Sequence, residues 1–363
     1  MFGGLLRGER AGRGPRYAML DLVARCNNVC LGCFFHCEAT KLPRGEGALD
    51  VEELPIELAG KVASELAAVG VREVYMAGEG EPLLHSRFFD VIALLKHAGL
   101  WLQVFTNGIL LDEDVARRIV DSGIDNLTVS LWAVTEAEHE RWYPGVSPRM
   151  LEKRLRGIRA LAAERKASSA RSELTLQMPI NRENLGALDR RVEIAVESGA
   201  TSVSFGYYRA YGSLLDYLAL GPGDMPAVRA AFRPALTRLD AAGIRHDADV
   251  FLERVRLGLA WLNTPCYAPW YACSIRVNGD VLVCPRCRKT MGNLNACSLA
   301  DIWSGVEYRG FRRQAMRQTP AEGKWALCDC ANCCWVRDNL RVHRVFKWFA
   351  PMARRRAGKD RPE

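Results

Sequence analysis

The stretch Arg25-Cys26-Asn27-Asn28-Val29-Cys30-Leu31-Gly32-Cys33 is the one around which this 363-residue chain is organised. It directly follows the apolar run 18–24, which predicts a buried strand. Three thiolates at a C-x3-C-x2-C spacing can hold three irons of a [4Fe–4S] cube, and the fourth iron then stays open to a small molecule. A zinc site and three unrelated buried cysteines are the alternatives that the spacing alone leaves open. The stretch therefore predicts an iron–sulfur loop at the end of a strand.

Beyond this loop, strands and helices alternate as far as residue 205. Strands are expected at 18–24, 72–77, 101–105, 126–131, 173–178 and 201–205, and helices at about 50–69, 85–98, 112–121, 148–166 and 184–198. Such repeats imply a parallel sheet with right-handed crossovers. The predicted fold class is α/β, with an open, partial (β/α)6 barrel, because six units are fewer than a closed eight-fold barrel needs. Ligands of such a sheet bind at the carboxyl ends of the strands, where the cysteine loop lies.

Polar residues follow further strands of the predicted barrel at this same edge. The second strand ends in Gly78-Glu79-Gly80-Glu81-Pro82, the third in Thr106-Asn107-Gly108 and the fourth at Ser130, and Gln177 lies on the fifth. A carboxylate such as that of Glu81 suits an ammonium group, and glycines allow a ligand to approach the backbone closely. Plain turns are the alternative for each motif.

Together, the cysteine loop and these strand ends resemble the motifs of the radical S-adenosylmethionine (radical SAM) superfamily, whose barrel is a partial, TIM-like one. The resemblance implies that the open iron chelates the amino and carboxylate groups of SAM. One electron from the cluster then cleaves SAM, and the resulting 5′-deoxyadenosyl radical abstracts a hydrogen atom from a C–H bond. The residues that the resemblance places around SAM are Gly80, Glu81, Thr106, Asn107, Ser130 and Gln177. Gly32 stands where the family usually has an aromatic residue, and Glu79 where many relatives have glycine.

A second group of cysteines lies beyond residue 260. Asn278-Gly279 between β-forming residues predicts a hairpin, with Cys266 before it and Cys284 at its end. This C-x12-G-x4-C spacing resembles the opening of the SPASM and twitch domains that follow many radical SAM barrels. The resemblance implies one auxiliary [4Fe–4S] cluster in the shorter, twitch form, and zinc is the alternative for two separated thiolate pairs. Its predicted ligands are Cys266, Cys284, Cys330 and Cys333.

The predicted organisation has five segments. They are an N-terminal extension at 1–17, the barrel at 18–220, a helical connection at 221–262, the SPASM/twitch-type domain at 263–338, and a basic C-terminal helix and tail at 339–363. The cysteines outside the ligand sets are interpreted as small buried hydrophobes, of which any one is also a candidate hydrogen donor. They are Cys37, Cys273, Cys287, Cys297 and Cys334, and Cys328 is an alternative ligand.

The composition of the chain limits its predicted location and its predicted partners. No signal peptide is evident and no apolar run approaches transmembrane length, so a reducing, cytoplasmic location is predicted, where grouped cysteines indicate metal. The net charge of +8 is modest and the arginines are spread along helices, so no nucleic-acid partner is expected. A flavodoxin- or ferredoxin-type electron donor is expected. Membrane-surface contact by the mixed apolar and basic tail is compatible with its composition but not favoured.

The main functional prediction is hydrogen abstraction from a carbinol carbon of a sugar-like or aminocyclitol small molecule. A ketone would result if the auxiliary cluster accepts the electron, and an epimer if a spare thiol returns a hydrogen atom. This prediction rests on the twitch-like spacing, the leftover cysteines and the aromatic residues Trp132, Trp142 and Tyr143, which either stack on a sugar ring or form a packed loop. The alternative is a maturase that modifies a ribosomally made peptide. An iron–sulfur electron carrier is disfavoured, because a carrier has no use for a SAM site.

Overall fold

A computed structural model of the protein describes residues 5, 8–33, 35–36, 51–208, 213–323 and 328–349. Its centre is a continuous ten-stranded sheet in the order β10-β9-β8-β1-β2-β3-β4-β5-β6-β7. From β8 to β7 each strand runs parallel to its neighbour, whereas β9 and β10 are antiparallel. The strands are β1 (Tyr17–Leu20), β2 (Glu73–Met76), β3 (Trp101–Thr106), β4 (Asn126–Ser130), β5 (Glu173–Ile180), β6 (Ser202–Tyr207), β7 (Arg245–His246), β8 (Ala272–Ile275), β9 (Asp280–Leu282) and β10 (Thr290–Asn293).

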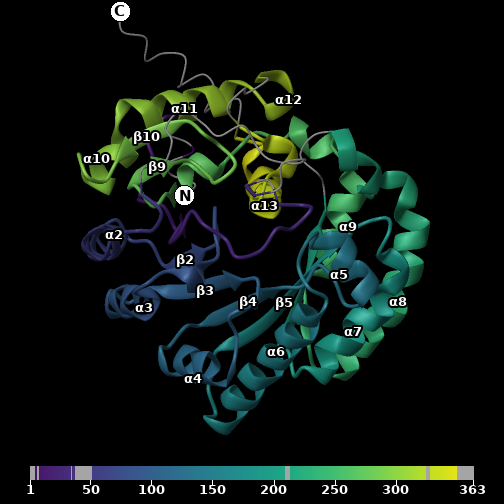
Figure 1. Ribbon diagram of the computed structural model, residues 1–363. Coiled ribbons are helices and arrows are strands. Elements are labelled where there is room, and N and C mark those ends of the chain that lie inside the picture. Colours follow the sequence, from purple (N-terminus) through teal and green to yellow (C-terminus); the bar gives the residue numbers. More distant parts are fainter. Residues whose placement is uncertain are drawn as a thin grey trace, which may run out of the picture.

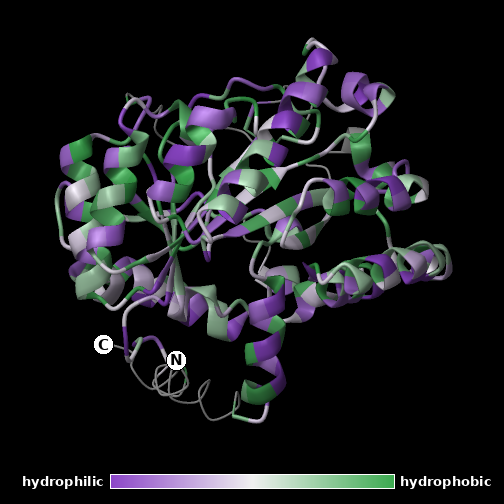
Figure 2. Ribbon diagram, turned by 90° about the horizontal axis from the view of Figure 1, so that it is seen from below, coloured by the Kyte–Doolittle hydropathy of each residue, from purple (hydrophilic) through white to green (hydrophobic). Residues whose placement is uncertain are grey.

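Helices surround the outer side of the parallel strands, and the C-terminal elements gather at the end of the sheet that carries β8 to β10 (Figure 1). Along the helices hydrophilic and hydrophobic residues alternate, as expected of elements with one buried side (Figure 2). The helices are α2 (Ile56–Ala68), α3 (Phe88–His97), α4 (Glu113–Asp121), α5 (Glu136–Trp142), α6 (Arg149–Ala167), α7 (Leu188–Glu197), α8 (Met225–Ala241), α9 (Ala248–Leu257), α10 (Leu299–Ser304), α11 (Val306–Arg317), α12 (Pro320–Gly323) and α13 (Val336–Phe346).

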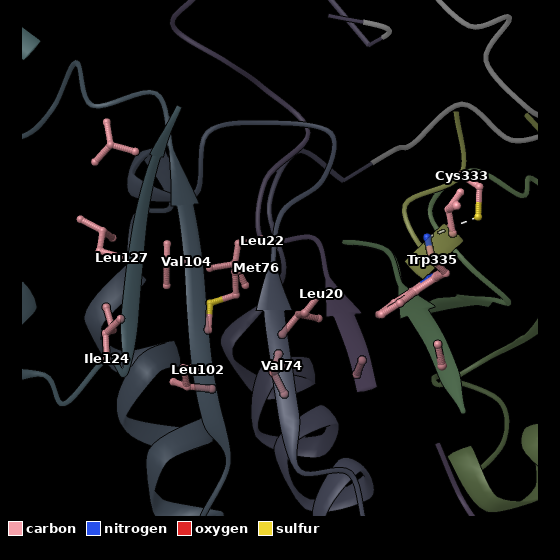
Figure 3. Packing of buried hydrophobic residues seen from close by; sticks show 14 of the residues in the cluster. Leu20, Leu22, Val74, Met76, Leu102, Val104, Ile124, Leu127, Cys333 and Trp335 are labelled. Atoms are coloured by element: carbon pink, nitrogen blue, oxygen red, sulfur yellow. Dashed lines mark hydrogen bonds between the residues drawn. The ribbon is translucent and has the colours of Figure 1, made fainter. Parts of the chain in front are cut away.

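The hydrophobic core lies between the sheet and these helices. Alternate residues of β1, β2 and β3 are buried, because successive side chains of a strand point to opposite faces. Leu20, Met76 and Val104 are buried core residues on these three adjacent strands (Figure 3). This packing fixes the strands and therefore the polar loops at their carboxyl ends.

The other face of the parallel strands lines the inside of the barrel and is mixed, with aromatic side chains such as Tyr75 and Trp101 on β2 and β3 and hydrogen-bonded polar side chains from β3 to β6. Gln103 Nε2 donates to Thr128 Oγ1 at 2.8 Å, and the hydroxyl oxygens of Thr175 and Ser202 are 2.6 Å apart. These pairs join β3 to β4 and β5 to β6. The interior thus combines hydrogen-bonding groups with aromatic side chains.

The fold class predicted from the sequence is confirmed, and the differences are local. Asp112 caps α4 as expected, since its Oδ1 accepts from the Val115 backbone N–H at 2.9 Å. Helix α2 begins later than predicted, at Ile56 after Pro55, and Asp50 lies outside the described residues. The two-residue β7 was not predicted, because so short a segment carries no alternating pattern.

The predicted hairpin is part of the barrel sheet. Strand β8 pairs in parallel with β1, with Met19 opposite Ser274, and β9 returns antiparallel to β8. Strand β10 extends the hairpin by one strand and was not predicted. The cysteine-rich region is therefore hydrogen-bonded directly to the strand that precedes the cysteine loop.

Within the described ranges, no helix has both the length and the apolar character needed to cross a membrane. Helix α13 packs through Val336, Val342 and Phe346, whereas Trp348 after it is 77% exposed. The basic tail from residue 350 onward lies outside the described residues.

Candidate functional site

The three cysteines of the first loop lie close together after β1. Electrostatic interactions connect the thiols of Cys26, Cys30 and Cys33. Burial raises the pKa of Cys26 to about 11 and raises that of Cys30 as well. Asn28 Nδ2 donates to Cys30 Sγ at 3.4 Å. Three gathered, half-buried thiols with amide donors fit the ligand set of a cluster with one open iron.

Glu81 connects the second and third strand ends to this loop. Its Oε1 accepts from the Thr106 hydroxyl at 2.6 Å and from the Leu83 N–H at 3.2 Å, and its Oε2 accepts from the Asn107 N–H at 2.7 Å. Burial raises the pKa of Glu81, and these donors oppose the rise. A carboxylate has about four acceptor positions. Three of them are occupied by the chain, which leaves one for an ammonium group.

The motif around Gly80 presses against the backbone of the cysteine loop. The Glu81 N–H donates to the Arg25 carbonyl at 3.1 Å. A Cβ on Gly80 would lie 2.2 Å from that carbonyl oxygen, so only glycine fits here. Asn107 Nδ2 donates to Asn27 Oδ1 at 2.7 Å and to Cys26 Sγ at 3.7 Å. The structure thus brings four of the predicted SAM residues, Gly80, Glu81, Thr106 and Asn107, to the cysteine loop.

Ser130 and Gln177 are also brought together. They are directly paired between β4 and β5, and Ser130 Oγ donates to Gln177 Oε1 at 3.4 Å. Both are half-buried and lie on the inner face of the barrel. Their strands, β4 and β5, are two and three strands away from β2, which precedes Glu81, on the far side of β3.

Glu79, in the loop after β2, has an ion-pair partner on the auxiliary hairpin. Arg276 beyond β8 donates to Glu79 Oε1 from Nε at 2.9 Å and from Nη2 at 2.6 Å. The pair is mostly buried, with side chains 17% and 19% exposed. It joins the loop after β2 to the turn of the auxiliary hairpin.

The aromatic residues after β4 form a packed cluster over the cysteine loop. Trp142 and Tyr143 are each 1% exposed and pack with Tyr208, so the packed-loop alternative holds for them. A Cβ on Gly32 would lie 2.6 Å from the Trp132 ring and 2.8 Å from the Tyr208 ring. Gly32 therefore lacks a side chain because these two rings, supplied by β4 and β6, occupy its space.

Arg154 on α6 is a candidate functional residue that the sequence analysis missed. It is fully buried, and none of its guanidinium nitrogens has a hydrogen-bond partner among the described residues. Its Cζ lies 4.4 Å from the centroid of the Tyr143 ring. The positive charge lowers the pKa of both Cys30 and Glu81, against the larger effect of burial. Burying an unpaired charge costs several kcal/mol, so this position is suited to an anion bound beside the loop.

A sequence signal for Arg154 existed. The buried residues Leu151, Leu155 and Ile158 form the apolar stripe of α6, and Arg154 falls on the same stripe. It was grouped with the surface arginines because α6 is rich in basic residues.

The predicted auxiliary ligands also come together. Electrostatic interactions connect the thiol of Cys266 to those of Cys284, Cys330 and Cys333. The Trp335 backbone N–H donates to Cys333 Sγ at 3.3 Å (Figure 3). Within the described ranges, no three His, Cys, Asp or Glu side chains surround one metal-ion position.

The auxiliary site lies near the opposite end of β1 from the first loop. Trp335, two residues after Cys333, stacks on Tyr17 at the start of β1 with ring centroids 5.5 Å apart. Tyr75 and Tyr271 contact the same indole edge-on. This aromatic group holds the C-terminal cysteines against the barrel.

The remaining cysteines occupy different environments. Cys273 is fully buried on β8, its thiol directed to the Tyr17 carbonyl at 3.9 Å, and Cys297 is exposed. Cys334 interacts electrostatically with Cys284 and Cys333. Cys287 faces Cys328 across an isolated antiparallel bridge. Cys37 lies outside the described residues.

Known proteins similar to this chain include peptide-modifying enzymes. The PqqA peptide cyclase of Granulibacter bethesdensis is 27% identical over 82% of this chain and 76% of its own length. The AdoMet-dependent heme synthase of Methanosarcina barkeri is 24% identical over 88% of this chain and 91% of its own. Streptococcus suis SuiB bound to its precursor peptide SuiA shares the fold, with a TM-score of 0.62 and 15% identity over 89% of this chain and 72% of its own.

These comparisons overturn the predicted substrate. The expected carbohydrate-like substrate, and with it the assignment as an oxidoreductase or epimerase acting on a carbinol carbon, is wrong, because the similar sequences include several PqqA peptide cyclases. The twitch-like spacing describes the auxiliary cluster and carries no information about the substrate. Two of the aromatic residues taken as sugar-stacking candidates are buried in the loop packing.

Two family models match the chain. The model of the radical SAM superfamily matches residues 21–203, and the model of the SPASM iron–sulfur cluster-binding domain matches residues 266–335. These domains imply three cofactors, a [4Fe–4S] cluster held by three cysteines, SAM, and an auxiliary cluster. The chain therefore belongs to the radical SAM superfamily and carries a SPASM domain after its barrel.

Proposed function

We propose that this chain is a radical SAM maturase that modifies a peptide. The similarity to PqqA peptide cyclases over more than four-fifths of the chain is the observation that carries the proposal. The shared fold with Streptococcus suis SuiB bound to precursor peptide SuiA is compatible with this proposal.

The residues of the first site would hold the cofactors as follows. Cys26, Cys30 and Cys33 would ligate the cluster, and the free acceptor position of Glu81 would face the amino group of SAM. Arg154 would pair with the carboxylate of SAM, which gives its buried charge a partner. When bound, the cluster and SAM supply a 5′-deoxyadenosyl radical that removes a hydrogen atom from the substrate.

The packed aromatic cluster would keep water from this site. Trp132 and Tyr208 cover Gly32 between the second and third cysteines, and Cys30 and Leu31 pack beneath the same cluster. Excluding water protects a radical from side reactions. The aromatic rings thus serve the cofactor loop rather than a sugar.

The test is turnover with candidate peptides encoded near this gene. Anaerobically reconstituted protein is incubated with SAM and a reduced flavodoxin- or ferredoxin-type donor, which is the electron source we propose. We expect one peptide to lose two hydrogens while 5′-deoxyadenosine forms in step, and deuterium in that peptide to appear in the 5′-deoxyadenosine. The control is the variant Cys26→Ala/Cys30→Ala/Cys33→Ala, which should form neither product.

A different substrate would be evident in the same assay. Consumption of a tetrapyrrole, with every peptide unchanged, would contradict the peptide proposal and favour a reaction like that of the heme synthase relative. Failure to form 5′-deoxyadenosine with any substrate would contradict the SAM-cleaving role itself.

A further inference from the structure

Two cysteines beside the auxiliary site face each other, one outside the predicted ligand sets and the other, Cys328, an alternative to one of the four predicted ligands. Cys287 follows β9 and Cys328 lies on the segment 328–335, which we call the C-terminal cysteine arm. The two residues pair across an isolated antiparallel bridge, and their thiols are hydrogen-bonded to each other. Both are reduced. Cys287 is 1% exposed and Cys328 is half-buried.

The backbone around this pair holds the two cysteines in register. The Asp329 N–H donates to the Arg286 carbonyl at 2.8 Å, and Arg286 Nη1 also pairs with Asp329 Oδ2 at 3.4 Å. Opposed residues of an antiparallel pair have Cα atoms about 4.5–5.5 Å apart. A disulfide needs about 4.4–6.8 Å. An antiparallel pair of this kind therefore falls within the range of Cα separations that a disulfide spans.

The predicted auxiliary cluster does not need these two thiols. A [4Fe–4S] cluster is complete with four thiolates, and the predicted ligands Cys266, Cys284, Cys330 and Cys333 would supply them, while Cys287 also interacts electrostatically with Cys266 and Cys284. The pair is nevertheless adjacent to this set, because the Cys328 thiol also hydrogen-bonds to Cys330. A covalent bond here would connect the element that carries Cys284 to the arm that carries Cys330 and Cys333.

We propose that Cys287 and Cys328 form a reversible thiol–disulfide switch, which in its oxidised form fixes the C-terminal cysteine arm to the auxiliary hairpin. Glutathione disulfide is the class of oxidant. One cysteine thiolate attacks it and releases one glutathione, and the second cysteine then displaces the other glutathione to close the S–S bond. The two cysteines lose two electrons, which reduce glutathione disulfide, and their two protons end on the two glutathione thiols.

The oxidised form keeps two cluster-bearing segments together when the cluster itself is absent. The arm is otherwise attached through non-covalent contacts such as the stacking of Trp335 on Tyr17 and the Arg254 Nη1 bond to the Cys333 carbonyl at 3.2 Å. A disulfide limits the conformations of the unfolded arm. The bond thereby preserves the ligand geometry for cluster assembly or repair.

The experiment uses the fully reconstituted protein, titrated anaerobically with glutathione disulfide and then digested without reduction. Mass spectrometry is expected to show one linked pair of peptides, containing Cys287 and Cys328, that disappears on addition of dithiothreitol. The link should be absent in Cys287→Ser and in Cys328→Ser and present in the matched control Cys273→Ser. The iron content of both serine variants should equal that of the unaltered protein.

Two results would overturn the switch. A loss of about four irons per chain in either serine variant would make that cysteine a cluster ligand. No linked peptide, or a link between other cysteines, would show that the pair is not redox-active. Cys287 is buried, so Cys287→Ser can fail to fold. In that case Cys328→Ser, at a half-buried position, tests the same disulfide by itself.

Discussion

At the scale of single residues, Arg154 combines complete burial with the lack of a hydrogen-bond partner among the described residues. Replacing an unpaired buried charge with an apolar residue of similar length usually stabilises a protein. A charged hydrogen bond to a ligand is worth about 1.5–3 kcal/mol, which corresponds to an affinity change of about 10- to 100-fold. The first effect concerns the stability of the cofactor-free protein and the second concerns SAM binding, so the two can be measured separately.

Arg154→Met is therefore expected to raise the melting temperature of the cofactor-free protein and to weaken SAM binding by about 10- to 100-fold. Thermal unfolding measures the first effect, and equilibrium dialysis of the reconstituted protein measures the second. Arg154→Lys, which keeps the charge, should recover part of the affinity. Unchanged SAM binding together with lost stability would assign Arg154 a purely structural role.

Asp21 is the second residue with an unusual environment. It is 5% exposed, and its Oδ1 has no hydrogen-bond partner in the part of the chain that is described. Burial raises the pKa of Asp21 well above 3.8, nearby Glu79 raises it further, and Arg276 opposes the rise. The folded state thus binds the proton more tightly than the unfolded state. The resulting stability is present below the ordinary pKa and is lost as the pH rises through the raised one.

Asp21→Asn is expected to remove the loss of stability at rising pH, because the amide of asparagine carries no charge to bury. The free energy of unfolding, measured by denaturant titration as the pH rises above the ordinary pKa of Asp, should fall less in the variant than in the parent. Glu81, whose pKa is also raised, is present in both proteins, so the difference isolates Asp21. If the free energies of unfolding of the variant and the parent change equally with pH, Asp21 does not cause the loss of stability.

At the scale of elements, the contact between the cysteine loop and the end of β4 depends on Gly32. Overpacking a closely packed site costs about 1–3 kcal/mol. The Trp132 ring stands 2.6 Å from the position of an added Cβ, and this ring is half-buried, so it can be removed without emptying the core.

Gly32→Ala is therefore expected to destabilise the protein by about 1–3 kcal/mol and to lower the iron content of the first cluster. In the Trp132→Ala background the same substitution should cost less, since one of the two colliding rings is gone. Denaturant titration and iron analysis of the four proteins form a double-mutant cycle. Equal costs in both backgrounds would show that Trp132 does not determine the need for glycine.

At the scale of the whole molecule, the two cysteine sites lie near opposite ends of β1 and are joined by one sheet. The β1–β8 pairing and the Glu79–Arg276 ion pair both cross from the barrel to the auxiliary hairpin. Despite this connection, the two ligand sets share no cysteine. Each cluster should therefore be removable by itself.

Anaerobic reconstitution is expected to give about eight irons per chain, as two cubes require. About four should remain in Cys26→Ala/Cys30→Ala/Cys33→Ala, and about four in Cys266→Ala/Cys284→Ala. Iron and sulfide analysis makes the measurement, with Cys297→Ala, at an exposed position, as the control. About twelve irons would mean that further cysteines ligate a second auxiliary cluster.

Local chemistry made most of the barrel predictable. The Asp112 cap, the alternation of β3 and the cysteine spacing are each contained within a few neighbouring residues, so the sequence displays them directly. The start of α2 at Ile56 differed from the helix predicted over about 50–69, and Glu53, inside that predicted range, instead accepts from Ser86 and Arg25. Contacts between residues about 30 positions apart leave no such local pattern.

The sequence by itself determined the family, the barrel and the identity of the three cysteines in the first loop, because turn chemistry, periodicity and ligand spacing are local properties. Only the tertiary structure decided that β8 lies beside β1, that Arg154 is buried next to Cys30, and that Trp132 and Tyr208 fill the space above Gly32. These features depend on the packing of segments far apart in the chain. Packing is set by the whole fold and cannot be assigned from any one stretch.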